Sequence, residues 1–212
     1  MTFRTACLFR FDVAASVESM PRKLRVQQPE TIYHVGSRGV DKQPIFDVVR
    51  WDREIFVEYL DCTVMTFRWN LHAYCLMGNH FHLVLDTPDG NLAAGMQYLK
   101  GRYAQWFNRA KGREGALFER RYWDRMAWNE AYVLALSRYV ALNPVRSGWC
   151  SSPEEWPWSS YAATIGLEPA PRFLRTDELL GWFGGGRTAR LQYAEFVRDA
   201  MARVATDDTI GV

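Results

Sequence analysis

The residues best suited to chemistry in this chain are two histidines, His80 and His82, in the run CLMGNHFHLVLDT at residues 75 to 87. In an extended strand, residues two apart face the same way, so both imidazoles project from one sheet face while Phe81 points to the other. Two neutral imidazoles on one face can share a divalent metal ion. His-x-His tripeptides are also common without a metal, with one ring bonded to a carboxylate and the other at a sheet edge. The spacing by itself is therefore compatible both with a shared metal ion and with two histidines that bind none.

A tyrosine and an asparagine indicate what such a metal ion would be for. In SRYVALNPVR (137–146), Tyr139 and Asn143 are four residues apart, so on a helix they lie one above the other on the same face. The phenol is a nucleophile, and the amide oxygen can complete the coordination of the metal. The run contains no HExxH motif, cysteine cluster or acidic trio, which disfavours a zinc protease and a two-metal nuclease.

This combination favours attack on a phosphodiester. The metal polarises the scissile phosphate, and Tyr139 attacks it to give a 5′-phosphotyrosine and a free 3′-OH. Because the bond energy is conserved in that intermediate, rejoining the strand needs no nucleotide cofactor. The chemistry is therefore cutting and resealing rather than hydrolysis.

The elements that must position these residues follow from the apolar pattern. Alternation predicts strands, and apolar positions one turn apart predict helices. Strands are predicted at 30–39, 68–78, 80–87 and 116–128, and helices at 51–67, 91–112 and 129–146. The order β, α, β, β, α, β, α predicts an α+β fold: a ferredoxin-like antiparallel sheet with helices on one face, plus one further helix.

Local features of these elements can also be predicted. Gly78-Asn79 favours a tight hairpin between the second and third strands. Asn91 is the expected N-cap of the second helix, and Pro144 is expected to stop the third. Within 68–78, two sets of side chains are predicted on opposite faces: Leu71, Ala73, Cys75 and Met77 on one, and His72, Tyr74 and Leu76 on the other.

Length and composition describe an ordinary globular chain of 212 residues, 48% apolar and 24% charged. No apolar run approaches the length of a membrane span. The four cysteines show no paired spacing, so neither a zinc knuckle nor a disulfide framework is suggested, and a reducing cytoplasm fits.

The chain is expected to divide into three parts. Residues 1–19 do not form a convincing secretory signal, and Met20 opens a basic MPRKLRV that is typical of a natural start. We therefore expect 1–19 to be a disordered or wrongly assigned extension, 20–148 to be the catalytic domain, and 149–212 to be a Trp/Pro-rich and then helical C-terminal extension.

Positive charge is concentrated in one region. The chain has 22 Arg and 4 Lys, and between Lys100 and Arg146 ten Lys or Arg face four acidic residues. Tyrosines and tryptophans interleave with these cations, as on a surface that binds single-stranded nucleic acid. A GC-rich coding sequence would also raise the arginine count, and a solvated basic helix face would give the same pattern.

Several segments together resemble the HUH-type single-tyrosine transposases, and within them the REP-associated tyrosine transposases of the IS200-like family. The matching words are YHVGSRGVDKQPIF, HAYCLMGNHFHLVLDTP, MQYLKGRYAQWFNR, ALFERRYW and LSRYVALNPVRSG, from about Met20 to Tyr161. The resemblance implies that His80 and His82 are metal ligands, that Tyr139 is the nucleophile, and that Asn143 assists the metal. It also implies Mg²⁺ or Mn²⁺, single-stranded DNA beside a palindromic hairpin as substrate, and a place in the bacterial cytoplasm at the nucleoid.

The resemblance leaves the DNA contacts and the assembly to be predicted from residue type. Arginines are the best candidates for backbone contacts, and Tyr103 and Tyr122 for base stacking. The arginines are Arg38, Arg102, Arg120, Arg121 and Arg146. The chain is expected to act as a monomer or a homodimer, without a membrane or a nucleotide. The competing function is a non-catalytic module that binds DNA or RNA hairpins and uses its histidines structurally.

Overall fold

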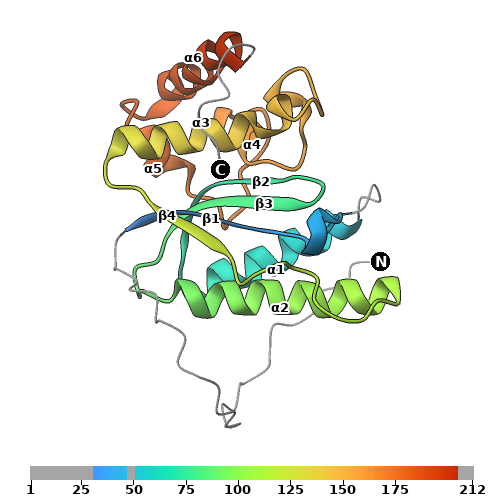
Figure 1. Ribbon diagram of the computed structural model, residues 1–212. Helices are drawn as coiled ribbons and strands as arrows, with labels where there is room; N and C mark the ends of the chain where they lie inside the picture. The colour runs from blue at the N-terminus through green and yellow to red at the C-terminus, as the bar shows by residue number, and fades with distance from the viewer. Residues whose placement is uncertain (1–30, 47–50, 205–212) are drawn as a thin grey trace.

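A four-stranded antiparallel sheet organises the computed structural model, which describes residues 31–46 and 51–204 (Figure 1). The strands are β1 (Ile32–Arg38), β2 (Asn70–Leu76), β3 (His80–Asp86) and β4 (Trp123–Met126). Their order in the sheet is β2-β3-β1-β4, with every pairing antiparallel. This is the ferredoxin-like arrangement, so the predicted fold class is confirmed. The prediction for residues 1–19 lies outside the described residues.

The two faces of the sheet carry different helices. Helices α1 (Trp51–Phe67) and α2 (Leu92–Lys111) cover one face, as predicted, and the further helix α3 (Glu130–Arg146) covers the other (Figure 1). The larger core lies between the sheet and helices α1 and α2, where Phe56, Leu60 and Phe81 are fully buried. Burial of each such side chain contributes about 1.5–3 kcal/mol. Packing against α1 and α2 therefore stabilises the sheet on one face, and the face toward α3 can carry a site.

The hairpin between β2 and β3 is as short as predicted. Gly78 and Asn79 form a two-residue connection, closed by the Met77 N–H, which donates to the His80 carbonyl oxygen at 2.9 Å. Neither residue has a positive φ, so this is not one of the primed turns that usually close two-residue hairpins. Hydrogen bonds from a neighbouring segment also stabilise the turn: the Ile45 and Phe46 N–H groups both donate to the Gly78 carbonyl oxygen.

One predicted alternation is wrong because β2 is irregular. Its register against β3 shifts between Leu71 and Ala73. Such a bulge inserts one residue and reverses which face the preceding side chains occupy. Leu71 therefore packs with Tyr74 in the larger core, whereas Ala73, Cys75 and Met77 face α3 as predicted.

The helix ends agree with the predictions in part. The Asn129 side chain caps α3 by accepting from the Tyr132 N–H at 2.8 Å. Asn91 occupies the N-cap position of α2, as predicted, but its side chain makes no capping bond; it instead accepts from the Trp69 indole N–H and donates to the Phe67 carbonyl. Pro144 does not stop α3, which continues to Arg146. The proline removes the N–H that would donate to the Val140 carbonyl, yet the helix ends only two residues later, where the Ser147 N–H donates to the Asn143 carbonyl.

The chain after α3 packs on the rest of the fold. It contains short helices η2 (Pro153–Glu155), α4 (Tyr161–Ile165) and α5 (Thr176–Gly181), then α6 (Gly186–Val204). Backbone bonds tie it to β2, with the Leu76 N–H donating to Trp158 and the Arg175 N–H donating to Leu71. Trp156 is 9% exposed and packs under α3.

Two further features complete the fold. The predicted fourth strand, 116–128, is shorter in the structure: β4 covers only Trp123–Met126, and a single bridge joins Phe118 to Gly39. A 3₁₀ turn, η1 (Val40–Lys42), follows β1. Within the described ranges, none of the helices combines the length and the apolar character that crossing a bilayer demands.

Candidate active site

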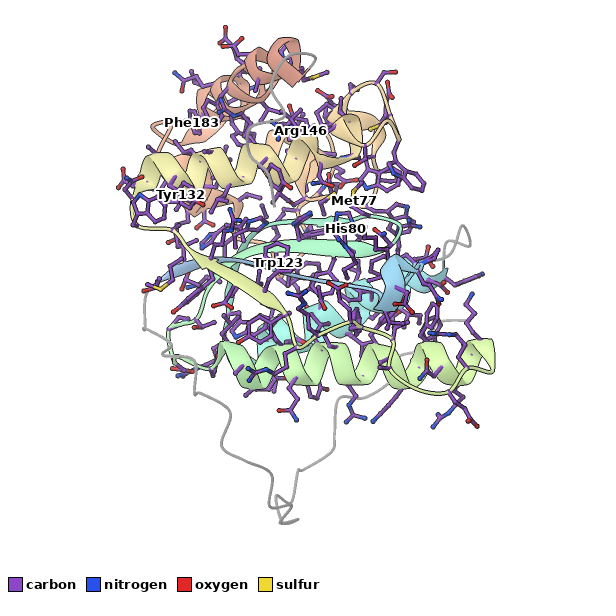
Figure 2. All side chains as sticks on the ribbon, in the orientation of Figure 1. Met77, His80, Trp123, Tyr132, Arg146 and Phe183 are labelled. Atoms are coloured by element: carbon purple, nitrogen blue, oxygen red, sulfur yellow. The ribbon has the colours of Figure 1, made fainter. Side chains whose placement is uncertain are left out.

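The predicted pair of histidines lies on the sheet face that α3 covers. His80 and His82 alternate with Phe81, which is fully buried in the opposite core. Opposite them in the register of β1 are Arg38 and Gly36. The two imidazole centroids are 4.9 Å apart, and Figure 2 shows His80 at the sheet below α3. The prediction that both rings share one face is confirmed.

Helix α3 brings the tyrosine and the asparagine to the same place. Val133, Leu136 and Val140 bury its inner face against the sheet, since apolar residues three and four apart form one stripe. The Tyr139 ring then stands edge-on to His82, with centroids 5.6 Å apart. Asn143, one turn later, is 6% exposed. Two segments nearly sixty residues apart thus form one site.

The donor atoms of this site fit a divalent metal. His82 Nε2 and Asn143 Oδ1 are buried and, in the described structure, have no hydrogen-bond partner. A buried polar atom without a partner is costly, and a metal ligand is one of the roles that explains it. Burial also lowers the pKa of His80 to about 4 and that of His82 well below its usual value. Both rings are therefore neutral at physiological pH, the form that binds metals.

A third histidine, His34, was missed by the sequence reasoning. It projects from β1 and its Nε2 lies 3.1 Å from His82 Nδ1. Its ring stacks on His82 at 5.2 Å, and burial lowers its pKa to about 3. A ligand histidine is commonly held by a partner on its second ring nitrogen, and His34 occupies that place for His82. The signal was available: the alternation in YHVGSR puts His34 on the inner face with Gly36.

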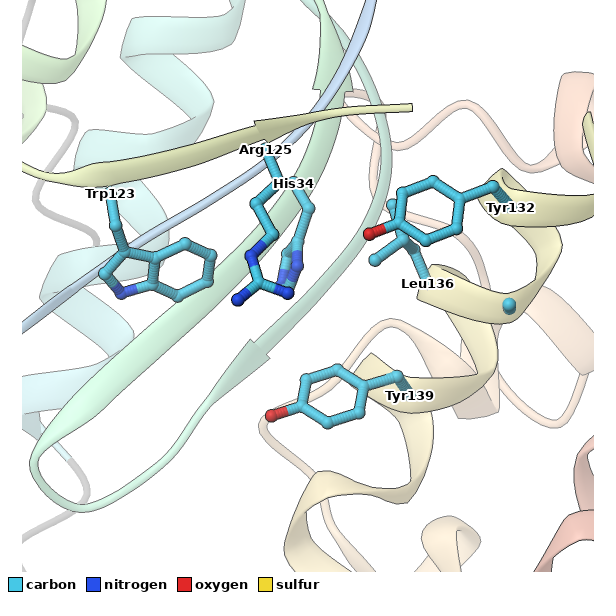
Figure 3. Close-up of a pocket in the computed structure, with 7 residues that line it drawn as sticks. His34, Trp123, Arg125, Tyr132, Leu136 and Tyr139 are labelled. Atoms are coloured by element: carbon cyan, nitrogen blue, oxygen red, sulfur yellow. The ribbon is translucent and has the colours of Figure 1, made fainter. Parts of the chain in front are cut away.

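A small pocket opens beside Tyr139, between β4 and α3 (Figure 3). Trp123 and Arg125 line it from β4, and Tyr132 and Tyr139 from α3. Trp123 stands edge-on to His34 at 4.7 Å. Trp123 was counted among the aromatic residues of the basic region but not placed at the site, and Arg125 and Tyr132 were not singled out, because nothing local in β4 or at the start of α3 marks them. The pocket combines aromatic faces with a cation next to the phenol.

The electrostatics around Tyr139 are mixed. Burial raises the pKa of Tyr139, and Arg146, the Asn143 side chain, Arg125 and Arg38 each act to lower it. The Arg146 guanidinium carbon is 5.3 Å from the centre of the phenol ring. These cations favour the phenolate and would equally attract a phosphate.

The five arginines predicted to contact DNA separate into groups. Arg38 and Arg146 act on the pKa of Tyr139 and belong to the site. Arg120 and Arg121 are exposed on the segment before β4. Arg102 lies on α2, the helix on the opposite sheet face, with its guanidinium over Tyr98. Only two of the predicted arginines therefore lie beside the phenol.

The prediction that Tyr103 stacks on DNA is wrong. Its side chain is 0% exposed within the core below the sheet, and its hydroxyl donates to the Ile45 carbonyl at 2.5 Å. Tyr122, the other candidate for stacking, is 5% exposed. Tyr103 lies on α2 and Tyr122 just before β4, and both rings pack in the larger core, which the basic sequence pattern does not reveal.

Gly36 is required for space at the centre of the site. A Cβ atom there would overlap the Phe81 carbonyl oxygen and the Trp123 indole, which packs against His34 and His82. We expect Gly36→Ala to lower the free energy of unfolding by about 3 kcal/mol, since overpacking forces backbone and ring to shift. Urea denaturation measures this.

Gly101→Ala is the matched control for that substitution. Gly101 lies within α2 and a Cβ there meets no atom within 4 Å. The change should raise stability by about 0.5–1 kcal/mol because alanine is the better helix former. Equal changes in the free energy of unfolding for Gly36→Ala and Gly101→Ala would show that packing of the Trp123 indole does not require a glycine at position 36.

Known proteins resemble this chain in sequence and in structure. The family model described as transposase, IS200-like, matches residues 28–146. A Haemophilus influenzae protein assigned as a REP-associated tyrosine transposase is 28% identical over 110 residues, which is 47% of this chain and 62% of that protein. The REP-associated tyrosine transposase of Escherichia coli K12 is 22% identical over 103 residues, 48% of this chain and 61% of that protein.

A solved structure shows the same fold. It is that of a REP-associated tyrosine transposase bound to a REP hairpin, with a TM-score of 0.58 and 17% sequence identity. The likeness covers 71% of this chain and 89% of that one. The match to the two sequence relatives spans a little over three fifths of their length.

Proposed function

This chain belongs to the family of IS200-like transposases, and we propose on that premise that it is a metal-dependent strand transferase for single-stranded DNA. It would nick and rejoin the strand at palindromic, hairpin-forming elements through a 5′-phosphotyrosine. The observation that carries the proposal is the meeting of Tyr139 and Asn143 with His80 and His82 on one sheet face. A hairpin-binding module has no use for a phenol beside this donor set.

The chain's own residues account for the steps. The Tyr139 oxygen attacks the scissile phosphorus, forming the new O–P bond as the bond to the 3′ oxygen breaks. The phenol releases its proton to water, and Arg146, Arg125 and Arg38 favour the phenolate that results. The 3′ oxygen takes up a proton as it departs. In the reverse direction a 3′-OH attacks the phosphotyrosine, which restores the phosphodiester and the free phenol.

His80, His82 and Asn143 are the residues that would hold Mg²⁺ or Mn²⁺. When bound, the ion would supply stabilisation of the negative charge that develops on the phosphate. His34 fixes the orientation of the His82 ring through the 3.1 Å contact between their nitrogens. The buried platform under the sheet keeps these rings in place before substrate arrives, which is the preorganisation that charge stabilisation requires.

The substrate is proposed from the relatives. One solved relative is described as bound to a REP hairpin, and the pocket beside Tyr139 offers aromatic rings and Arg125 to an unpaired nucleotide. Aromatic faces with adjacent cations are the features that bind single-stranded nucleic acid. We propose that the strand to be cut passes between β4 and α3.

The direct test is the covalent adduct. The chain is incubated with labelled single-stranded hairpins from the palindromes that flank its own gene, with Mn²⁺, with Mg²⁺ or with chelator, and resolved under denaturing conditions. An adduct that needs metal supports the strand transferase. Tight binding to several of these hairpins without an adduct would instead support the non-catalytic hairpin-binding module.

Loss of the His34 contact is expected to weaken metal binding without unfolding the protein. His34→Phe keeps a ring but cannot bond His82 Nδ1, and we expect Mn²⁺ affinity to fall about 10- to 100-fold. His34→Gln keeps an acceptor, the amide oxygen, for the His82 Nδ1–H and should retain most of that affinity. Calorimetric titration measures both, and equal affinity in the two variants would remove His34 from a positioning role.

Arginines at the site should set the salt dependence of DNA binding. Arg38→Gln and Arg146→Gln should each weaken binding and reduce the slope of log K against log salt by about 1, since each removes one phosphate contact. Arg102→Gln, on the helix of the opposite face, is the matched control and should leave the slope unchanged. A slope that falls equally in all three variants would place the DNA on a broader surface.

A further inference from the structure

A second cluster of metal-binding side chains lies away from the candidate active site. It contains His72 from β2, Asp86 from the end of β3 and Glu178 from α5. One ligand atom of each residue lies within 4.8 Å of those of the other two. We propose that this cluster is a second divalent-metal site, suited to Zn²⁺, in which His72 and Glu178 are ligands and Asp86 holds the imidazole.

The hydrogen bonds around Asp86 place a proton on Nε2 of the His72 imidazole. His72 Nε2 lies 2.8 Å from Asp86 Oδ1, and Asp86 Oδ2 accepts from the Asn70 amide at 2.9 Å. A carboxylate can only accept here, so Nε2 carries a proton, and in the metal-binding form of the ring Nδ1 presents its lone pair. This is the carboxylate–histidine–metal arrangement, in which the outer carboxylate sets the tautomer and raises the basicity of the ligand nitrogen.

The lone pair on Nδ1 points to a ligand. His72 is 0% exposed, and its Nδ1 has no hydrogen-bond partner among the described residues. The nearest charged atom is Glu178 Oε2, 3.7 Å away. Two ligands of a tetrahedral zinc ion at its usual bond lengths are separated by about 3.3 Å. A shift of a few tenths of an ångström in the Glu178 side chain would therefore bring both atoms into the coordination shell.

Access and donor type also suit this ion. The Glu178 side chain is 49% exposed, so it can move, and water can fill the coordination positions that the protein leaves open. An imidazole nitrogen with a carboxylate oxygen is a normal zinc donor set. Asp86 and His82 are four residues apart on β3, about 13 Å along an extended strand, so this site is separate from the one beside Tyr139.

The consequence of the site is structural. His72 and Asp86 belong to the sheet, whereas Glu178 belongs to the chain that follows α3. The segment entering α5 already docks on β2, where the Arg175 N–H donates to the Leu71 carbonyl at 2.7 Å. An ion between His72 and Glu178 would add a second link and fasten α5 to the sheet.

The competing explanation is a protonated His72 that bridges the two carboxylates without a metal. Glu178→Gln separates these explanations and leaves the buried His72–Asp86 pair intact. Asp177→Asn is the matched control, since Asp177 is the adjacent exposed carboxylate on the same helix. Both are placed in the full chain carrying His80→Ala and His82→Ala, which removes the other proposed metal site.

The measurement is calorimetric titration with Zn²⁺ alone, together with the melting temperature with and without Zn²⁺. We expect the background chain and its Asp177→Asn form to bind one Zn²⁺ and to melt at a higher temperature with it. Glu178→Gln should weaken binding at least tenfold and lose that rise. Equal binding in all three forms, or none in the background chain, would overturn the proposal. So would a Glu178→Gln effect on melting that appears only in acid and without Zn²⁺. The adduct assay is not involved, so each proposal can fail independently.

Discussion

Tyr139→Phe is expected to abolish the covalent protein–DNA adduct while leaving hairpin binding intact. The substitution removes one oxygen from a ring that stands 5.6 Å from His82 and 5.8 Å from His34, and it leaves the ring itself in place. The half-buried side chain keeps its packing, so neither the fold nor the cationic surroundings should change. Without the phenol oxygen no phosphotyrosine can form, and the loss should be complete within detection.

The neighbouring tyrosine of the same helix is the matched control. Tyr132 lines the same pocket, two turns before Tyr139, and Tyr132→Phe removes the same atom type. We expect Tyr132→Phe to form the adduct with labelled hairpin and Mn²⁺, and Tyr139→Phe to bind the hairpin equally well but form none. An adduct in the Tyr139→Phe sample would show that another residue is the nucleophile. Loss in both variants would show that the pocket, rather than one oxygen, limits the reaction.

His80→Ala is expected to reduce metal-dependent cleavage by roughly 10²- to 10³-fold, the range seen when one group that stabilises transition-state charge is removed. His80 is only partly buried at the start of β3, so the melting temperature should change little. Its neutral ring is proposed as a metal ligand, and the alanine offers no donor. The adduct yield is measured over a range of Mn²⁺ concentrations.

Asn79→Ala provides a graded comparison for that result. The Asn79 side-chain oxygen lies 2.7 Å from His80 Nδ1 and orients the ring without belonging to the proposed ligand set. We expect about a tenfold loss, partly recovered at high Mn²⁺, because the ligand nitrogen is still present. A His80→Ala protein that retains full yield and the same metal requirement would remove His80 from the ligand set. If the unmodified chain gives the same adduct yield with chelator, the reaction does not depend on a metal ion.

The spacing of residues within single elements predicts which faces carry the candidate site residues, and the order of the elements predicts the sheet. A period of two placed His80 and His82 on one face, and a period near 3.6 placed Tyr139 above Asn143. Both are properties of a single element, so neither needs information from the rest of the chain. The element order, read from the same periodicities, predicted the ferredoxin-like sheet that the structure has.

Some features depend on local irregularities that the pattern hides. The bulge in β2 moves Leu71 to the opposite face from Ala73, because one inserted residue reverses the alternation. Pro144 does not end α3, which runs on to Arg146, because the tertiary packing of the helix outweighs the loss of one backbone hydrogen bond in its last turn. The Asn91 side chain bonds Trp69 instead of capping α2, since a tertiary partner competes with the helix end.

The tertiary structure alone decided which faces meet. Packing of Val133, Leu136 and Val140 set α3 against the histidine face rather than the other one, and strand pairing brought His34 of β1 beside His82. The same packing buried Tyr103 in the core, against its predicted role. Sequence periodicity fixes the faces of each element, but the contacts between elements depend on register and burial over long separations. The histidine pair on one strand face and the Tyr139–Asn143 pair on one helix face could therefore be predicted from the sequence, whereas their assembly into one site could not be derived from spacing.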